Sequence, residues 1–175
     1  MELQKVLSLI SMSDLEFPHY LAGGCVRDTL MGVEPKDYDV VVVLPEHMQS
    51  YEASFAHVYD YAHHWRELGA TATVYEAYGL VDGTPVDPCS FSDRLWCCLK
   101  VECMGIIMDF LYTKSLDIET HIAGHDCNIN QVYFDGCTIV GSIPDKLEWV
   151  TGEVLRPGRK EYMQGKFDEY IKRTR

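Results

Sequence analysis

The sequence predicts a single α+β domain, built from a mixed or antiparallel sheet flanked by helices and followed by a short helical appendage. Its 175 residues, 47% of them hydrophobic, can bury one core and are too few for two ordinary domains. Helical and extended segments alternate first, and several extended segments then follow one another, an order typical of α+β proteins. We expect residues 1–145 to form the main domain and residues 146–175 an appendage that is not an independent domain.

The first part of the chain is expected to alternate between helices and strands. Val6, Leu7, Ile10 and Leu15 recur at near-helical spacing, which indicates an amphipathic helix. The run YDVVVVL is largely β-branched, as in a strand buried inside a sheet. Glycine and proline separate the segments. In order, the sequence predicts a helix at residues 3–15, a strand at 17–22, a helix at 26–31, a strand at 38–44 and a helix at 46–68.

The later part of the chain is expected to be mostly extended. Two of its strands meet at Met104-Gly105, and two others meet at Asp135-Gly136, so each pair predicts a hairpin. The prolines and glycine of residues 79–93 indicate a loop. The predicted strands are residues 72–78, 95–102, 106–112, 132–134 and 138–140, and the predicted helices are residues 115–122 and 160–173.

Composition excludes several classes of protein. No apolar run reaches the roughly 18 residues of a membrane span, and the N-terminus lacks an export signal, so we expect a soluble, cytoplasmic protein without membrane contacts. None of the seven cysteines forms a C-x-x-C pair, so they predict buried thiols rather than a zinc or redox site. His57 and His64 share one helix face, but no carboxylate or cysteine completes a metal site there.

The charge is unevenly distributed. A net charge of −12 argues against broad binding of nucleic acids, which requires lysine and arginine to neutralise phosphates. From Arg156 onward, however, the net charge is +4, which leaves −16 for the rest of the chain. This basic segment is either a docking surface for a polyanion or a solvated helix face carrying both signs.

Three aspartates have the arrangement of metal ligands. Asp37 and Asp39 are two residues apart at the start of a predicted strand, which places both side chains on the same face. Asp109 lies in another apolar strand, where a buried carboxylate needs a partner. Carboxylates are ligands of magnesium, and two magnesium ions can stabilise the attacking and leaving oxygens of a phosphoryl transfer. A surface position for Asp109 stays open.

A glycine-rich turn precedes these aspartates. Gly23-Gly24 lies between a predicted strand and a predicted helix, where glycine allows close approach of the backbone to an anion. Arg27, one turn into the helix, carries a planar fork of donors suited to phosphates. A turn and a D-x-D pair are each common, but their succession within 22 residues indicates a site for a triphosphate and magnesium.

The segment LAGGCVRDTLMGVEPKDYDVVVV, residues 21 to 43, resembles the signature of class II CCA-adding enzymes and bacterial poly(A) polymerases, in the polymerase beta nucleotidyltransferase superfamily. Residues 125 to 130, HDCNIN, resemble the family's R-R-D-F-T-x-N-A motif. The resemblance covers roughly residues 18 to 140. It implies a nucleotidyltransferase head domain with Asp37, Asp39 and Asp109 as catalytic metal ligands, and with a nucleotide site formed by Gly23, Gly24, Arg27, Asp28, Asp126 and Asn130.

The chain departs from the family pattern in three places. Gly124-His125 replaces the basic pair before Asp126, and Cys127 stands where an aromatic residue is usual. The nucleotide-selecting helix, with its E-D-x-x-R pattern, has no convincing counterpart in residues 159–173. The long helical body that grips tRNA has no counterpart either, so a partner protein that supplies it is an open alternative.

The resemblance implies transfer of a nucleoside monophosphate from ATP or CTP to an RNA 3′ end, with tRNA as the first candidate and the basic segment as its docking surface. Two alternatives stay open. The acceptor could be a protein or a small molecule, or the chain could be an inactive relative that binds or inhibits another protein.

Overall fold

The computed structural model describes residues 2–75, 80–81, 84–85, 92–150 and 155–175. The helices are α1 (Glu2–Ser11), α2 (Gly24–Leu30), α3 (Tyr51–Glu67), α4 (Ile118–Ala123) and α5 (Arg159–Thr174), with 3-10 helices η1 (Glu46–Met48), η2 (Ser92–Arg94) and η3 (Asn128–Asn130). The strands are β1 (His19–Ala22), β2 (Tyr38–Val43), β3 (Thr71–Tyr75), β4 (Leu80–Val81), β5 (Thr84–Pro85), β6 (Leu95–Cys103), β7 (Ile106–Thr113), β8 (Tyr133–Phe134) and β9 (Ile139–Val140).

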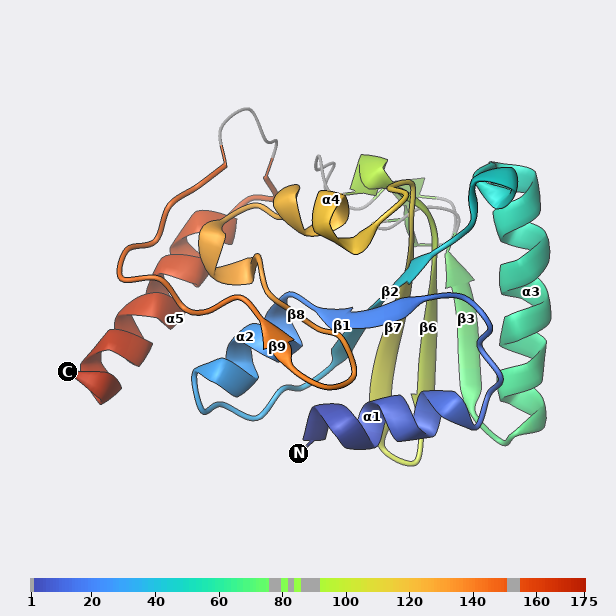
Figure 1. Cartoon of the computed structure of the whole chain (residues 1–175), viewed down its shortest axis with the longest axis horizontal. Coiled ribbons are helices and arrows are strands. Elements are labelled where there is room, and N and C mark those ends of the chain that lie inside the picture. Colours follow the sequence, from blue (N-terminus) through green and yellow to red (C-terminus); the bar gives the residue numbers. More distant parts are fainter. Residues whose placement is uncertain (1, 76–79, 82–83, 86–91, 151–154) are drawn as a thin grey trace.

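A seven-stranded sheet organises the described residues, in the order β3-β6-β7-β2-β1-β8-β9 (Figure 1). Neighbouring strands run antiparallel except β2 and β7, which are parallel. Figure 1 shows α3 beside one end of the sheet, and α2 and α5 together at the other end. The predicted α+β class with a mixed sheet is therefore confirmed, including the C-terminal helix.

The two faces of the sheet are covered differently because side chains alternate along each strand. Tyr38, Val40 and Val42 point to one face, where they join α1 and α3 in the main hydrophobic core. Val41 points to the other face and packs with Ile118 and Ile122 of α4. This second face is the one that also carries Asp39.

Several element boundaries differ from the expected ones. Residues 46–68 do not form one helix, because α3 begins only at Tyr51, where the Ser50 side chain caps it by accepting a hydrogen bond from Ala53 N at 3.1 Å. The first helix ends at Ser11, ahead of Asp14, whose φ of 56° is left-handed. The segment predicted as a loop at residues 79–93 includes β4 and β5, and residues 76–78 of the predicted third strand lie outside the described residues.

The predicted hairpin between β6 and β7 is confirmed. Met104 and Gly105 both have positive φ, 54° and 78°, as a two-residue turn between antiparallel strands requires. The hairpin between β8 and β9 is also present, and Asp135 accepts hydrogen bonds from Cys137 N and Thr138 N at its turn.

The C-terminal helix packs on α2 and η3 rather than on the sheet. Met163 and Phe167 of α5 are buried against Met31, Cys127 and Ile129. The side chains of Leu147 and Trp149, which precede α5, extend this second hydrophobic cluster. None of the helices in the described residues is both long enough and apolar enough to cross a membrane.

Candidate active site

The carboxylates of Asp39 and Asp109 lie on the same face of the sheet. The two residues are direct partners in the parallel pairing of β2 with β7, so their side chains point the same way. Asp109 is only 7% exposed, Asp39 is partly buried, and Asp37, just before β2, is exposed. The structure therefore brings together the two strand aspartates, with Asp37 two residues away at the rim.

Burial and mutual repulsion make these carboxylates hard to ionise. Burial is the main cause that raises the pKa of Asp39 to about 8, and the charges of Asp109 and Asp37 add to it. Burial also raises the pKa of Asp109, against the opposing charge of Lys100. The Lys100 Nζ atom, on β6, lies 3.8 Å from Asp109 Oδ1. A cation beside Asp39 would relieve the repulsion, as Lys100 does for Asp109.

A divalent cation fits these residues by their chemistry. Three carboxylates supply the oxygen ligands that magnesium prefers, and two of them already share one face. Among the described residues, however, no group of three histidine, cysteine, aspartate or glutamate side chains is close enough to hold a metal as it stands. The exposed Asp37 would have to turn toward the strand pair to complete a set of three.

The turn at Gly23-Gly24 lies beside the carboxylates, because Ala22 pairs with Asp39. Gly23 precedes α2 with a φ of 66°, a conformation that side chains other than glycine rarely adopt. A Cβ at Gly23 would also lie 3.3 Å from Cε1 of His125. The first glycine of the motif is therefore required by the backbone and by the close approach of His125.

The guanidinium of Arg27 is held inside the protein rather than pointing to an open surface. Arg27 is 5% exposed, and its Nε donates to Asp28 Oδ1 at 2.9 Å. Its Nη1 donates to Asn130 Oδ1 at 2.7 Å and contacts the sulfur of Met163. The phosphate contact predicted for Arg27 stays a prediction, and the observed contacts show a bridge between α2, η3 and α5.

Asp126 and Asn130 continue this network. Asn130 Nδ2 donates to Asp126 Oδ1 at 2.8 Å, and Arg159 Nε donates to Asp126 Oδ2 at 2.6 Å. At the other end, Lys166 Nζ lies 3.2 Å from Asp28 Oδ1. A chain of bonds thus runs through six side chains in the order Lys166, Asp28, Arg27, Asn130, Asp126 and Arg159.

Sequence reasoning did not find Arg159 or Lys166 as parts of the site. The two residues are seven apart and share one face of α5, which was the available signal. That spacing gives no indication of a partner, because Asp126 and Asp28 lie 33 and 138 residues away along the chain. Sequence reasoning also missed Lys100 and Arg94, whose partners lie far away along the chain. Arg94 Nη1 donates to the carbonyl oxygen of Gly124.

Two buried histidines lie at or just before the start of the second motif, residues 125–130. His125 Nδ1 and Asn130 O are 2.7 Å apart, and the His121 ring stands edge-on to that of His125, with 5.2 Å between centroids. Burial lowers the pKa of His125, and it lowers that of His121 to about 3. Both rings are therefore neutral at pH 7, so His125 adds no positive charge beside Asp126.

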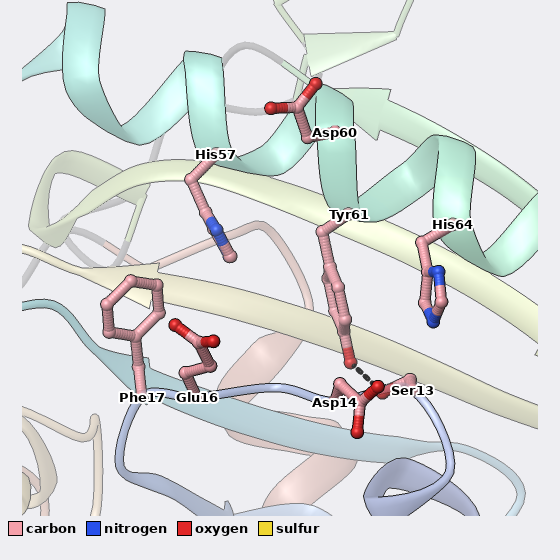
Figure 2. Close-up of a pocket in the computed structure, with 8 residues that line it drawn as sticks. All are labelled: Ser13, Asp14, Glu16, Phe17, His57, Asp60, Tyr61 and His64. Carbon is pink, nitrogen blue, oxygen red and sulfur yellow. Dashed lines mark hydrogen bonds between the residues drawn. The ribbon is translucent and has the colours of Figure 1, made fainter.

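A pocket of about 280 Å³ lies away from the carboxylates, between α3 and residues 13–17 (Figure 2). His57 and Tyr61 point into it from α3, and Tyr61 Oη lies 2.6 Å from Ser13 Oγ. His57 Nε2 lies 3.1 Å from Tyr112 Oη. His57 and His64 therefore both line this pocket, on the side of the sheet opposite Asp39.

Comparison with known proteins identifies one matching family model. Residues 19–78 match the poly A polymerase head domain. The match confirms the resemblance predicted from residues 21–43, and it contains Gly23, Gly24, Arg27, Asp37 and Asp39. It ends before Asp109 and the second motif. No curated protein sequence matches the chain.

The chain is also similar to solved structures of CCA-adding enzymes. The chain is 19% identical to a CCA-adding enzyme in complex with ATP, with a TM-score of 0.45 over 78% of this chain and 30% of that one. For the Thermotoga maritima CCA-adding enzyme complexed with tRNA, the identity is 19% and the TM-score 0.42, over 76% and 28% of the two chains. For a tRNA nucleotidyltransferase complexed with a primer tRNA and an ATP analogue, the identity is 15% and the TM-score 0.39, over 86% of this chain and 34% of that one. The chain therefore spans about a third or less of each of these proteins.

Proposed function

We propose that this chain is a magnesium-dependent nucleotidyltransferase that moves a nucleoside monophosphate from ATP or CTP to an acceptor hydroxyl. The match of residues 19–78 to the poly A polymerase head domain supports the reaction class. The pairing of Asp39 with Asp109 carries the proposal, because two repelling carboxylates on one sheet face require a cation when both are ionised.

In this proposal, Asp39, Asp109 and Asp37 hold magnesium. The metal would activate the acceptor hydroxyl and stabilise the negative charge on the leaving pyrophosphate. The hydroxyl oxygen attacks the α-phosphorus, the bond from that phosphorus to the bridging oxygen breaks, and the hydroxyl proton is released to water. Asp28 and Asn130 fix Arg27 beside Gly24, whose Cβ position lies 3.4 Å from Arg27 Nη2, and so keep the turn in place.

The acceptor we propose is an RNA 3′ end, with tRNA as the first candidate. The Thermotoga maritima CCA-adding enzyme, one of the similar proteins, is complexed with tRNA in its solved structure. The basic segment after Arg156 offers less free charge than its composition suggests, because Arg159 and Lys166 face Asp126 and Asp28. Arg173 donates to the carbonyl oxygen of Met31. Binding of RNA would therefore use the rest of this segment.

The acceptor is tested by incubating the purified chain with α-labelled ATP or CTP, magnesium and separate pools of total RNA, protein and small metabolites. Label in the RNA pool supports the proposal. Label found only in the protein or metabolite pool would mean that the chain transfers nucleotides to an acceptor other than RNA. Binding of the nucleotide without transfer to any pool would show an inactive relative. The double variant Asp37→Ala, Asp39→Ala controls for contaminating enzymes, since transfer that survives in it would not come from this site.

A further inference from the structure

Positions 124 and 125, where the family has two basic residues, carry no positively charged side chain in this protein. Gly124 has no side chain, and the neighbouring His125 is buried and neutral. The guanidinium of Arg27 is bonded to Asp28 and Asn130, and the phosphate contact predicted for it stays a prediction. In a chain of net charge −12, a bound triphosphate needs positive charge from elsewhere.

Arg94 brings a guanidinium to Gly124. It comes from η2, 30 residues earlier in the chain, and its Nη1 donates to the Gly124 carbonyl oxygen. A Cβ added to Gly124 would overlap this guanidinium, so Arg94 would have to move aside for any side chain at this position. The backbone does not require glycine here, because Gly124 has a φ of −87° and a ψ of 0°. The glycine at position 124 therefore leaves the space that the Arg94 guanidinium occupies.

Arg159 brings a second guanidinium to the other side of the same segment. Its Nε donates to Asp126 Oδ2 at 2.6 Å, and about a third of its side chain stays exposed. Through Asp126 and Asn130, Arg159 is linked to Arg27, which lies beside Gly24. Arg94 thus contacts residue 124, and Arg159 contacts residue 126. The two arginines therefore flank residues 124–126.

We infer that Arg94 and Arg159 bind the triphosphate of the nucleotide, and that they replace from two distant segments the basic pair absent at residues 124–125. This inference rests on the proposed function. A guanidinium offers a planar set of donors that matches phosphate oxygens, and it keeps its charge at any physiological pH. Asp126 orients Arg159, and the Gly124 carbonyl orients Arg94.

Two glutamine variants test the inference. Arg94→Gln and Arg159→Gln each keep an amide donor for the observed hydrogen bond and remove the charge. Affinity for ATP and CTP, with magnesium, is measured by calorimetry, and affinity for AMP and CMP is measured alongside. Each variant should weaken triphosphate binding by about tenfold or more, with a smaller loss for the monophosphates. Lys160→Gln, next to Arg159 on the first turn of α5, is the matched control and should bind as the wild type does.

A relocation variant separates phosphate binding from support of the fold. In Arg94→Gln, position 124 has room for a side chain, so Gly124→Arg in that background returns a guanidinium to the same segment of the chain. This double variant should recover part of the lost affinity for ATP. Thermal unfolding of all variants identifies any that fail to fold, and their place is then taken by Arg94→Lys or Arg159→Lys, which should lose less affinity than the glutamine variants.

The outcomes distinguish this inference from the proposed function. If wild-type protein binds ATP and transfers nucleotide while Arg94→Gln and Arg159→Gln bind ATP equally well, the two arginines are not phosphate ligands and the inference is wrong. Equal losses for AMP and ATP would likewise contradict it, because a triphosphate contact affects ATP more. If the wild type binds no nucleoside triphosphate, the proposed function itself fails.

Discussion

Asp39 of β2 and Asp109 of β7 are direct partners in a parallel strand pair, so two carboxylates lie side by side on one face of the sheet. Antiparallel neighbours surround this pair on both sides. The arrangement stabilises the protonated form of Asp39 in the absence of a cation, and it links the ionisation of the site to the stability of the fold.

Replacing Asp39 should change how stability depends on pH. In the metal-free folded protein the pKa of Asp39 is raised from 3.8 to about 8, so the folded state holds this proton more tightly than the unfolded chain does. The stabilisation that comes from the raised pKa of Asp39 is therefore at its maximum below about pH 4 and is lost as the pH rises through about 8. Urea unfolding of Asp39→Asn should show a smaller decline across this window than the wild type. An identical decline in both proteins would contradict the raised pKa.

Removing Asn130 should destabilise the network around Arg27. In Asn130→Ala, the buried Arg27 loses an acceptor and Asp126 loses a donor, so we expect the free energy of unfolding to fall by about 2 to 3 kcal/mol. Gln131→Ala is the control, because Gln131 Nε2 makes an exposed hydrogen bond to the Ala123 carbonyl oxygen at 3.3 Å. This replacement should lower the free energy of unfolding much less. Chemical denaturation measures both, and equal losses would mean that the network adds no special stability.

Two glycine-to-alanine changes should have opposite effects. Gly23→Ala forces a left-handed φ of 66° on alanine and places a Cβ 3.3 Å from His125, so we expect a loss of about 1 to 2 kcal/mol or more. Gly165→Ala lies on the exposed side of α5 with no atom within 4 Å of the new Cβ, and should stabilise the protein by up to about 1 kcal/mol. Thermal unfolding gives the sign of each change, and a stabilising Gly23→Ala would contradict the turn geometry.

The His121 ring should stay neutral well into the acid range. Burial is the main cause that lowers its pKa from 6.5 to about 3, and the proximity of His125 and Arg94 also lowers it. The folded state thus binds this proton less readily than the unfolded chain, so its stability falls as the pH drops below about 6.5 toward 3. The ring proton signals of His121 in NMR spectra should not shift between pH 7 and 5. A titration midpoint in that range would contradict the buried, neutral ring.

The sequence allowed prediction of the strands that carry the carboxylates, because apolar runs of β2 and β7 are local signals. It also located Asp39, Asp109 and the Gly23 turn. The parallel pairing of β2 with β7 could not be predicted, since it joins segments about 70 residues apart and no local pattern encodes strand order. The inward direction of Arg27 and the contacts of Arg159 and Arg94 depend on that packing. For the same reason the sequence left α5 as either a docking surface or a solvated helix face, whereas two of its cations contact Asp126 and Asp28.

The proposed active site is tested by the rate of magnesium-dependent nucleotide transfer from labelled ATP or CTP to total RNA, measured for the wild type, Asp39→Asn and Asp109→Asn. Each asparagine preserves shape and removes a ligand charge, so we expect transfer by the wild type and a loss of about a hundredfold or more in both variants. Asp168→Asn, an exposed change on α5, should match the wild type. Transfer that continues undiminished in Asp39→Asn and Asp109→Asn would contradict the proposed active site.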